Sequence, residues 1–345
     1  MLDELTAVVT AALEQREIGE AEMHRAVAAM MDGRCSEMEI ASVLTALRCR
    51  GESVDQLVGA ARAMRERATP IATKRRGLLD TCGTGGDGLH TFNVSTATAL
   101  VAAAAGVPVA KHGNRSASSR SGSADVLEAL GVSLALTPQQ VGECIDDVGI
   151  GFCFAQSVHT AMKHVAPVRK QLGFRTIFNL LGPLTNPAGA EFQLVGACRI
   201  TLAELLAEAL SRLGVKHALV VCGNDELDEV SLWGETTVIQ VRGEAVLRHT
   251  WTATTLELPE CSVSDVRVGS PEESAAVVRG VLEGAVGPAR NLVLANAAAA
   301  FVAAERVETP RQGVELAAGA IDTGEAARLL ERFAARTRDV VPEKR

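Results

Sequence analysis

Apolar residues recur every three or four positions through the first part of the chain, with polar and charged residues between them. Leu5, Val8, Val27 and Met31 follow this spacing, which places apolar side chains along one face of a helix. We therefore predict that residues 1–73 form a small all-helical domain.

Two local signals predict where helices of this domain begin. Ser36 is followed by Glu39, the pattern of a capping box ahead of an apolar run. Ser53 is a second candidate cap, and its helix should end near Pro70, because proline rarely continues a helix. The basic residues 74–76 are then expected to form a surface connection to the rest of the chain.

Beyond Gly77, short apolar runs alternate with helical stretches. The runs typical of buried strands lie at residues 78–79, 107–110 and 217–222, and a hairpin turned at Gly243 is expected from residues 237–241 and 245–248. The helical stretches include residues 96–105, 124–130 and 291–334, a helix starting at Thr137 and Pro138, and one that Thr201 and Glu204 should cap and Gly214 should end. This alternation predicts an α/β fold for a large domain over residues 74–345. Its central sheet should be mixed but mostly parallel and should bind ligands at the carboxyl ends of its strands.

Residues 163–187 form a distinctive segment between these regions. A basic helical piece comes first, and a stretch rich in glycine and proline follows it. We expect this helical segment to cross between the two domains and join them.

Four glycines fall within six residues directly after the first short strand, at Gly83, Gly85, Gly86 and Gly88. Glycine permits positive φ and close backbone approach, so such a loop can point several N–H groups at one anion. Polar side chains follow at the next helix start, and residues 111–119 supply a second cluster of donors. Two such clusters predict a ligand with two phosphate groups.

Two better-known phosphate motifs do not fit this loop. The spacing of its glycines matches the dinucleotide pattern, but residues 107–112, where a ribose-binding carboxylate would be expected, contain none. A P-loop would need lysine and a hydroxyl residue after its second glycine, whereas Gly88 is followed by Leu89 and His90.

Composition narrows the class of protein. With 34 basic and 42 acidic residues the net charge is −8, which disfavours nonspecific nucleic-acid binding. There is no tyrosine and only two tryptophans, so platforms that stack bases are not expected. The eight cysteines show neither a C-x-x-C pair nor Cys/His metal spacing, which is typical of a reducing cytoplasm. No signal peptide and no run long enough to span a bilayer is evident, so we expect a cytoplasmic protein that does not contact membranes.

Four segments together resemble the signature segments of the anthranilate phosphoribosyltransferases, and the resemblance is collinear over nearly the whole chain. They lie at residues 83–96, 111–125, 162–187 and 227–231. The resemblance implies transfer of the 5-phosphoribosyl group of phosphoribosyl pyrophosphate (PRPP) to the amine of anthranilate, giving N-(5-phosphoribosyl)anthranilate and pyrophosphate in tryptophan biosynthesis. It also implies one or two Mg²⁺ ions bound with PRPP, the fold shared with the nucleoside phosphorylases, and a homodimer formed through the helical domain.

The resemblance assigns roles to residues that suit them chemically. For PRPP these are Gly83, Gly85, Gly86, Asp87, Thr91, Asn93, Val94, Ser95, Thr96, Lys111, Asn114, Arg115, Ser118, Ser119 and Ser123. For anthranilate they are Gly83, His112, Asn114, Arg169 and Pro183, and for the metal Ser95, Asp228 and Glu229. Arg169 would hold the anthranilate carboxylate, because a planar guanidinium suits bidentate recognition.

Little covalent chemistry is expected, because an aromatic amine is already nucleophilic and the enzyme mainly aligns the substrates and stabilises the departing negative charge. No covalent nucleophile is therefore predicted, and His112 is a candidate proton acceptor. Gln156 and Thr160 stand where this family often has prolines, which could alter the loop at the acceptor entrance.

Two other functions remain open at this point. One is a pyrimidine nucleoside phosphorylase-like enzyme on the same fold, which the basic residues 111–115 oppose. The other is a catalytically silent relative that binds nucleic acid, which the acidic net charge opposes.

Overall fold

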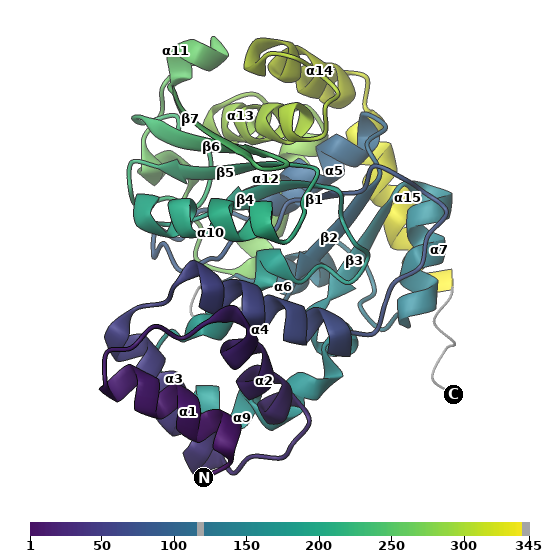
Figure 1. Cartoon of the computed structure of the whole chain (residues 1–345). Helices are drawn as coiled ribbons and strands as arrows, with labels where there is room; N and C mark the ends of the chain where they lie inside the picture. The colour runs from purple at the N-terminus through teal and green to yellow at the C-terminus, as the bar shows by residue number, and fades with distance from the viewer. Residues whose placement is uncertain (116–120, 340–345) are drawn as a thin grey trace.

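The N-terminal region folds as a helical bundle at one end of a larger α/β domain, in a computed structural model that describes residues 1–115 and 121–339 (Figure 1). Its helices are α1 (Asp3–Leu13), α2 (Glu20–Met31), α3 (Glu37–Arg50) and α4 (Val54–Arg67). Both predicted caps are confirmed. The Ser36 side chain accepts a hydrogen bond from the Glu39 amide, and the Ser53 side chain accepts one from the Gln56 amide.

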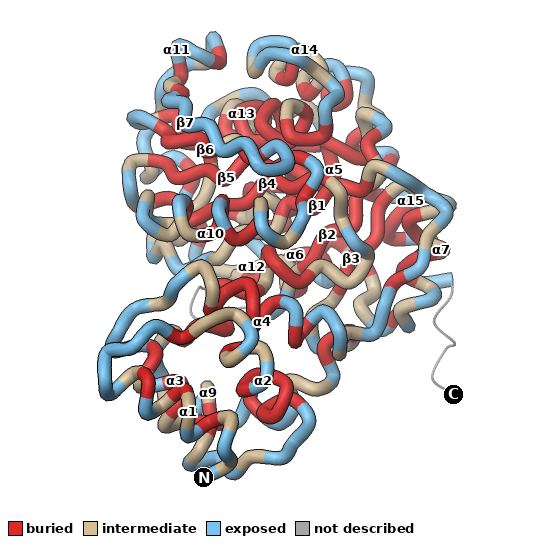
Figure 2. Tube along the Cα trace, viewed as in Figure 1, coloured by how far each residue is buried: buried red, intermediate tan, exposed pale blue. Residues whose placement is uncertain are grey.

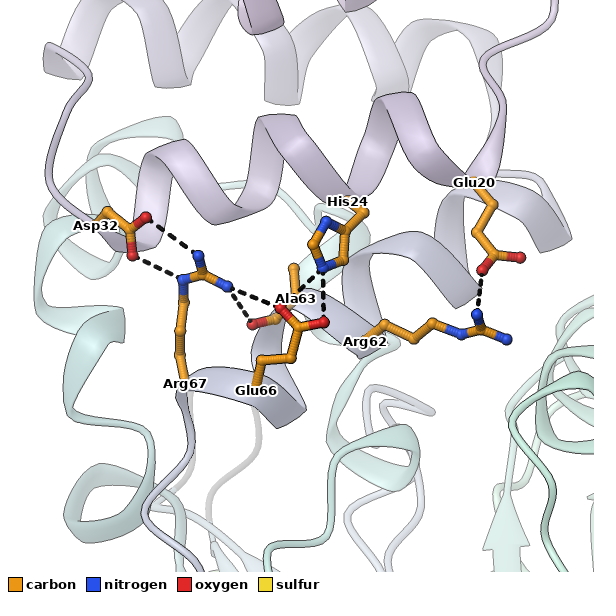
Figure 3. Close-up of polar contacts among 7 residues, drawn as sticks. All are labelled: Glu20, His24, Asp32, Arg62, Ala63, Glu66 and Arg67. Carbon is orange, nitrogen blue, oxygen red and sulfur yellow. Dashed lines mark hydrogen bonds and ion pairs between the residues drawn. The ribbon is translucent and has the colours of Figure 1, made fainter.

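Helices α2 and α4 lie against each other, and polar pairs flank their contact (Figure 3). Arg67 pairs with Asp32 at 2.7 Å, His24 with Glu66 at 2.9 Å, and Arg62 with Glu20 at 2.8 Å. Such exposed pairs contribute at most about 1 kcal/mol each. The apolar side chains buried between the helices therefore supply most of the stability of the bundle.

The α/β domain is built on a seven-stranded sheet with the strand order β3-β2-β1-β4-β5-β6-β7. Its strands are β1 (Leu79–Asp80), β2 (Val109–Gly113), β3 (Ile150–Phe154), β4 (Phe192–Gly196), β5 (His217–Gly223), β6 (Thr236–Arg242) and β7 (Ala245–Trp251). Strands β1 to β5 run parallel, whereas β6 and β7 form the predicted antiparallel hairpin. The mixed, mostly parallel sheet is thus confirmed. Strand β7 is largely exposed at one edge (Figure 2).

Helices cover both faces of this sheet, and every residue of β5 is buried. Leu219 and Val221 belong to the core beneath α5 (Val94–Ala104) and α13 (Pro288–Ala303), whereas Val220 and Cys222 face α10 (Ile200–Arg212). Successive strand residues point to opposite faces, so an uninterrupted apolar strand is covered on both sides. The other helices are α6 (Ser123–Ala129), α7 (Pro138–Val148), α8 (Ala155–Val158), α9 (Ala166–Leu172), α11 (Ala253–Leu256), α12 (Pro271–Leu282), α14 (Pro310–Asp322) and α15 (Glu325–Asp339), and the 3-10 turns are η1 (Thr160–His164), η2 (Ile177–Asn179), η3 (Gly182–Leu184) and η4 (Val263–Val266).

The predicted cap of α10 is wrong. The helix begins at Ile200, and Thr201 lies inside its first turn. The amide of Ile200 donates to the Asp225 carboxylate at 2.7 Å. A side chain distant in sequence therefore caps this helix, and no local pattern could show it.

The bundle and one face of the sheet share a single hydrophobic core. Helix α4 packs against α10, and Arg212 of α10 pairs with Glu20 at 2.7 Å and also with Asp55. From α4, Arg65 Nε donates to the Leu184 carbonyl at 2.7 Å. These contacts fix the bundle against α10 and against the η3 turn that contains Leu184.

The segment over residues 163–187 lies between the two regions. Helix α9 packs on α3, and Val165 and Val168 are buried in the core of the bundle. The domain limits at residues 73 and 74 stay a prediction. Within the described ranges, no helix combines the length and the apolar character needed to cross a membrane.

Candidate active site

A pocket of about 670 Å³ opens at the carboxyl ends of the parallel strands, where the sequence placed the ligand site. The loops that follow β1, β2, β3 and β5 form its walls, and η1, α9 and the turns after α9 close it from the side of the bundle. The pocket therefore lies at the junction of the two regions.

The structure gathers most of the predicted site residues in this pocket. Its lining includes Gly83, Gly85, Gly86, Asp87, Thr91, Asn93, Val94, Ser95, Lys111, His112, Asn114, Arg115, Ser123, Arg169, Asp228 and Glu229. Ser118 and Ser119 lie outside the described residues.

Two predicted residues are not part of the lining. Thr96 is 1% exposed and donates its hydroxyl to Asn93 Oδ1 at 2.6 Å, so the fold itself uses that group. Pro183 is buried in η3, where its carbonyl accepts a hydrogen bond from Gln193 at 2.6 Å, and the neighbouring Gly182 lines the pocket instead.

The glycine loop has the backbone conformation that its composition predicts. Gly85, Gly86 and Gly88 have φ values of +62°, +82° and +72°, a region that other residues rarely adopt. Thr84 N donates to the Gly196 carbonyl at 2.9 Å, and Gly85 N donates to Asp228 Oδ2 at 2.8 Å. The loop is thus held between the end of β4 and the segment after β5.

Two further sources of positive potential face the same end of the pocket. Helix α5 begins at Val94, so its N-terminus lies at the part of the cavity that Val94 and Ser95 line, and the partial positive charge of a helix N-terminus favours anions. Lys111, in the middle of β2, donates to the Thr81 carbonyl at 3.1 Å and to Ser95 Oγ at 3.3 Å. The Lys111 ammonium group and the N-terminus of α5 together suit a phosphorylated ligand.

Three carboxyl groups lie beside this loop, from Asp87, Asp228 and Glu229. Each residue keeps part of its surface in the pocket, but the carboxyl groups of the last two lie deep. Burial, together with the charge and hydrogen bond of Asp87, raises the pKa of Asp228 to about 7. Burial and the charge of Asp228 likewise raise the pKa of Glu229.

This cluster fits a divalent cation. Among the described residues, no lysine or arginine forms an ion pair with any of the three carboxylates. A hard cation such as Mg²⁺ prefers carboxylate oxygens, and its charge would offset the burial and the mutual repulsion that raise these pKa values. The hydroxyl of Ser95 lies nearby, because the backbone of Ser95 hydrogen-bonds to Glu229.

Arg169 lies at the other end of the pocket, on α9. Its guanidinium stacks over the Phe178 ring at 5.6 Å, and burial lowers its pKa. In the part of the chain that the structure describes, no carboxylate pairs with it. An arginine with its fork unused in a pocket is suited to a carboxylate ligand.

His112 is oriented so that one ring nitrogen can accept a proton. Its Nδ1 lies 2.9 Å from the Gly182 carbonyl, which can only accept, so Nδ1 carries the hydrogen and Nε2 a lone pair. Nε2 is buried without a partner in the described structure, and burial lowers the pKa of the ring. The His159 ring lies 5.1 Å away, centroid to centroid, and burial lowers its pKa to about 3. Both rings are therefore neutral near pH 7.

The amide of Asn114 is oriented by its neighbours. Its Oδ1 accepts from the Arg115 amide at 2.8 Å and from Gln156 Nε2 at 3.3 Å, so the Nδ2 side of the amide is directed away from these two partners and can donate to a ligand. Gln156 and Thr160 both line the pocket. The first of these two departures from the family pattern is thus used as a hydrogen-bond donor.

Arg115 contributes to the lining, but its charge is already engaged. Its guanidinium pairs with Asp125 at 2.7 Å and Glu128 at 2.6 Å, both on α6, and these hydrogen bonds raise its pKa. Any contact with a phosphate must compete with those carboxylates.

Sequence reasoning missed two features of the site. Arg175 lines the pocket and contacts the glycine loop. It was missed because no sequence pattern around an arginine in a loop indicates such a contact. Asp80, Cys82 and His112 place potential metal-ligand atoms within 4.8 Å of one another, which their spacing did not suggest. Asp80 already accepts from the His112 amide and from Asn186, so the three acids beside the glycine loop are the better site for a hard cation.

The comparisons with known proteins agree with this geometry. Residues 6–68 match the family model described as the glycosyl transferase family, helical bundle domain, and residues 75–327 match the glycosyl transferase family, a/b domain. The anthranilate phosphoribosyltransferase of Symbiobacterium thermophilum is 53% identical, over 95% of this chain and 96% of that protein. That of Moorella thermoacetica is 47% identical, over 96% and 98%.

Solved structures of the same enzyme resemble the fold closely. The anthranilate phosphoribosyltransferase of Thermus thermophilus superposes with a TM-score of 0.90 at 46% identity, covering 96% of this chain and 99% of that one. The Saccharomyces cerevisiae enzyme in complex with PRPP and Mg superposes with a TM-score of 0.91 at 27% identity, covering 99% of both chains. The yeast enzyme has also been solved with 4-fluoroanthranilate, and there the TM-score is 0.88 at 26% identity, over 97% of this chain and 98% of that one.

Proposed function

The chain belongs to the anthranilate phosphoribosyltransferase family, and on that premise we propose that its pocket transfers the 5-phosphoribosyl group of PRPP to the amine of anthranilate. The observation that carries the proposal is that one cavity has two ends with different chemistry. A glycine loop whose Gly86 amide has no acceptor among the described residues lies beside three carboxylates at one end, and an arginine that pairs with no carboxylate in the described structure lies at the other. These ends match a magnesium-bound diphosphate and an aromatic carboxylate, the products being N-(5-phosphoribosyl)anthranilate and pyrophosphate.

The donor end would hold PRPP through backbone and side-chain donors. We assign the pyrophosphate to the loop at residues 83–87 and further PRPP contacts to the start of α5, Lys111, Asn114 and Ser123. Thr96 and Pro183 are left out of the proposed contacts, because their polar groups are used inside the fold.

Asp228, Glu229 and Ser95, with Asp87 close by, would hold Mg²⁺. When bound, this ion would neutralise the negative charge of the leaving pyrophosphate. The protein's own part is to keep the carboxylates deep and close together, where Gly85 N already donates to Asp228.

The acceptor end would orient the amine. Arg169 binds the anthranilate carboxylate, and His112 Nε2 accepts the proton that the amine loses when its nitrogen bonds to the ribose carbon. The bond from that carbon to pyrophosphate breaks in the same exchange, so no covalent enzyme intermediate is needed. The low basicity of His112 suffices, because an arylammonium ion is much more acidic than an alkylammonium ion.

Anthranilate fluorescence tests the proposal directly. With purified protein, the signal should fall only when PRPP and Mg²⁺ are both present, and pyrophosphate should form in equal amount. No loss of fluorescence under saturating conditions would refute the transferase. Phosphorolysis of thymidine in its place would establish the nucleoside phosphorylase alternative.

We also propose that the chain forms a homodimer through its helical bundle. Leu13 at the end of α1 is 78% exposed, and Met38 at the start of α3 is 80% exposed. Large apolar side chains this exposed on one small domain suit a partner surface. Sedimentation should give twice the 36.1 kDa of one chain, and Met38→Glu should weaken the dimer, whereas a monomeric wild type would exclude it.

A cytoplasmic location completes the proposal. All eight cysteines are free thiols, which suits a reducing compartment. Cell fractionation tests this, and recovery in an oxidising compartment would contradict it.

A further inference from the structure

Arg175 connects the segment between the two regions to the glycine loop. It lies between the end of α9 and η2, and it lines the pocket. Its Nη1 donates to the Gly85 carbonyl at 2.8 Å, and its Nη2 donates to the Thr84 carbonyl at 3.2 Å. One guanidinium thus holds two consecutive carbonyls of the loop.

The loop is shaped to receive this side chain. A Cβ built on Gly86 would lie 1.4 Å from Arg175 Nη1, and Gly86 has a φ of +82°. Only glycine leaves the space that the guanidinium occupies. The packing of Arg175 therefore explains why residue 86 is a glycine, even without a bound ligand.

The two hydrogen bonds also determine where the amides of the loop point. In a trans peptide the C=O and the following N–H point in opposite directions. The Thr84 carbonyl is turned to Arg175, and the N–H of Gly85 on the other side of that peptide donates to Asp228 at 2.8 Å. The Gly85 carbonyl is also turned to Arg175, so the N–H of Gly86 points away from it, and no acceptor in the described chain takes that N–H.

The charge of Arg175 also favours anion binding at the glycine loop. A carbonyl oxygen left without a donor in the pocket would repel a phosphate, and the guanidinium donates to two of them. Within the described residues Arg175 forms no ion pair with a carboxylate, so its full positive charge remains beside the loop. Arginine presents five donors in a fixed fork, and the two hydrogen bonds to the loop leave others for a ligand.

We propose that Arg175 is a positioning residue that turns the Gly86 amide of the glycine loop toward the diphosphate of the donor substrate and adds its charge to that end of the pocket. The inference rests on the proposed function for the identity of the donor. Arg175 follows Arg169 by six positions along the same segment, so it also ties the diphosphate cradle to the segment that holds the acceptor.

Binding of inorganic pyrophosphate with Mg²⁺, measured by calorimetry, tests the proposal independently of turnover. Arg175→Met removes the charge and the donors but keeps a long side chain, and it should weaken pyrophosphate binding and raise the KM for PRPP at least about tenfold, with the KM for anthranilate within about twofold of wild type. Arg175→Lys should recover part of the loss, because an ammonium keeps the charge but cannot hold both carbonyls in a fork. Arg199→Ala removes a cation near the site whose partners are the carbonyls of Cys198 and Asp225, and it should leave pyrophosphate binding unchanged.

Two results would overturn the proposal. One is pyrophosphate binding by Arg175→Met equal to that of the wild type. The other is an equal loss for both substrates with a lowered melting temperature and no recovery in Arg175→Lys, which a merely structural role would give. If the wild type bound pyrophosphate in an Arg175-dependent way but never consumed anthranilate, the proposed function would fail and the role of Arg175 would stand.

Discussion

Replacing Arg169 by alanine should lower kcat/KM for anthranilate far more than it affects PRPP. The guanidinium is half-buried over Phe178, and among the described residues it has no carboxylate partner. In the wild type the anthranilate carboxylate would supply that partner. In the variant it would enter a partly dry pocket without a counter-charge.

The size of the effect follows from this burial. Removing one partner of a buried, hydrogen-bonded charge pair costs about 2–5 kcal/mol. Because Arg169 keeps some contact with solvent, we take the lower part of that range, about 2–4 kcal/mol. At about 1.36 kcal/mol for each factor of ten, kcat/KM should fall by about 30- to 900-fold. Arg169→Lys should lose less, since lysine keeps the charge without the bidentate fork.

Initial rates followed by anthranilate fluorescence, with each substrate varied in turn, measure this change. Lys170→Ala is the matched control, because it removes an exposed cation from the neighbouring position on α9. A substrate without the carboxylate, such as aniline, gives a sharper comparison, since Arg169→Ala should abolish the preference for anthranilate over aniline. A preference that survived, or an equal rise in the KM for PRPP, would refute the assignment.

Three other predictions concern the metal, the loop and stability. Replacing Asp228 by Asn and Glu229 by Gln should remove the oxygens that hold Mg²⁺ and reduce turnover more than about a hundredfold; a metal titration checks this, and an unchanged Mg²⁺ response would contradict it. Gly86→Ala should raise the KM for PRPP at least about tenfold, because its Cβ would lie 1.4 Å from the arginine nitrogen, whereas Gly88→Ala shares the positive φ but has nothing within 4 Å and should cost less. His159 has a pKa of about 3 in the folded state against about 6.5 in the unfolded state, so the unfolded state binds the proton first as the pH falls. The free energy of unfolding should therefore be highest above about pH 6.5 and should fall by about 3 kcal/mol by about pH 4.5. Urea unfolding at the two pH values measures that slope, and His159→Gln should flatten it; an equal slope in the variant would show that another group is responsible.

Much of the fold was predictable because its signals are local. Periodicity indicated the helical bundle, Ser36 and Ser53 indicated two helix starts, and the run at residues 217–222 indicated a buried strand. Each of these depends on residues within a few positions of one another. The place of the site followed as well, since parallel strands bring their carboxyl ends together.

What failed depended on partners distant in sequence or on side-chain orientation. Asp225 caps α10, although a cap at Thr201 looked locally sound. Thr96 turned its hydroxyl to Asn93 rather than to the pocket, and Arg115 found carboxylates on α6. Such choices are settled by packing, which short patterns do not describe. The role of Arg175 was hidden for the same reason.

The two ends of the pocket attract anions in different ways, and this separates the substrates. The Gly86 amide and Lys111 draw a diphosphate to the donor end, but the carboxylates of Asp228 and Glu229 repel it unless a cation offsets their charge. Arg169 needs no such cation to attract a carboxylate. Anthranilate has one negative charge and no diphosphate that could bind the metal, so it gains little binding energy at the donor end. PRPP gains most of its binding energy there. Each substrate is therefore directed to its own end by charges that the chain itself provides, and the reacting amine and ribose carbon are left to meet between them, beside His112.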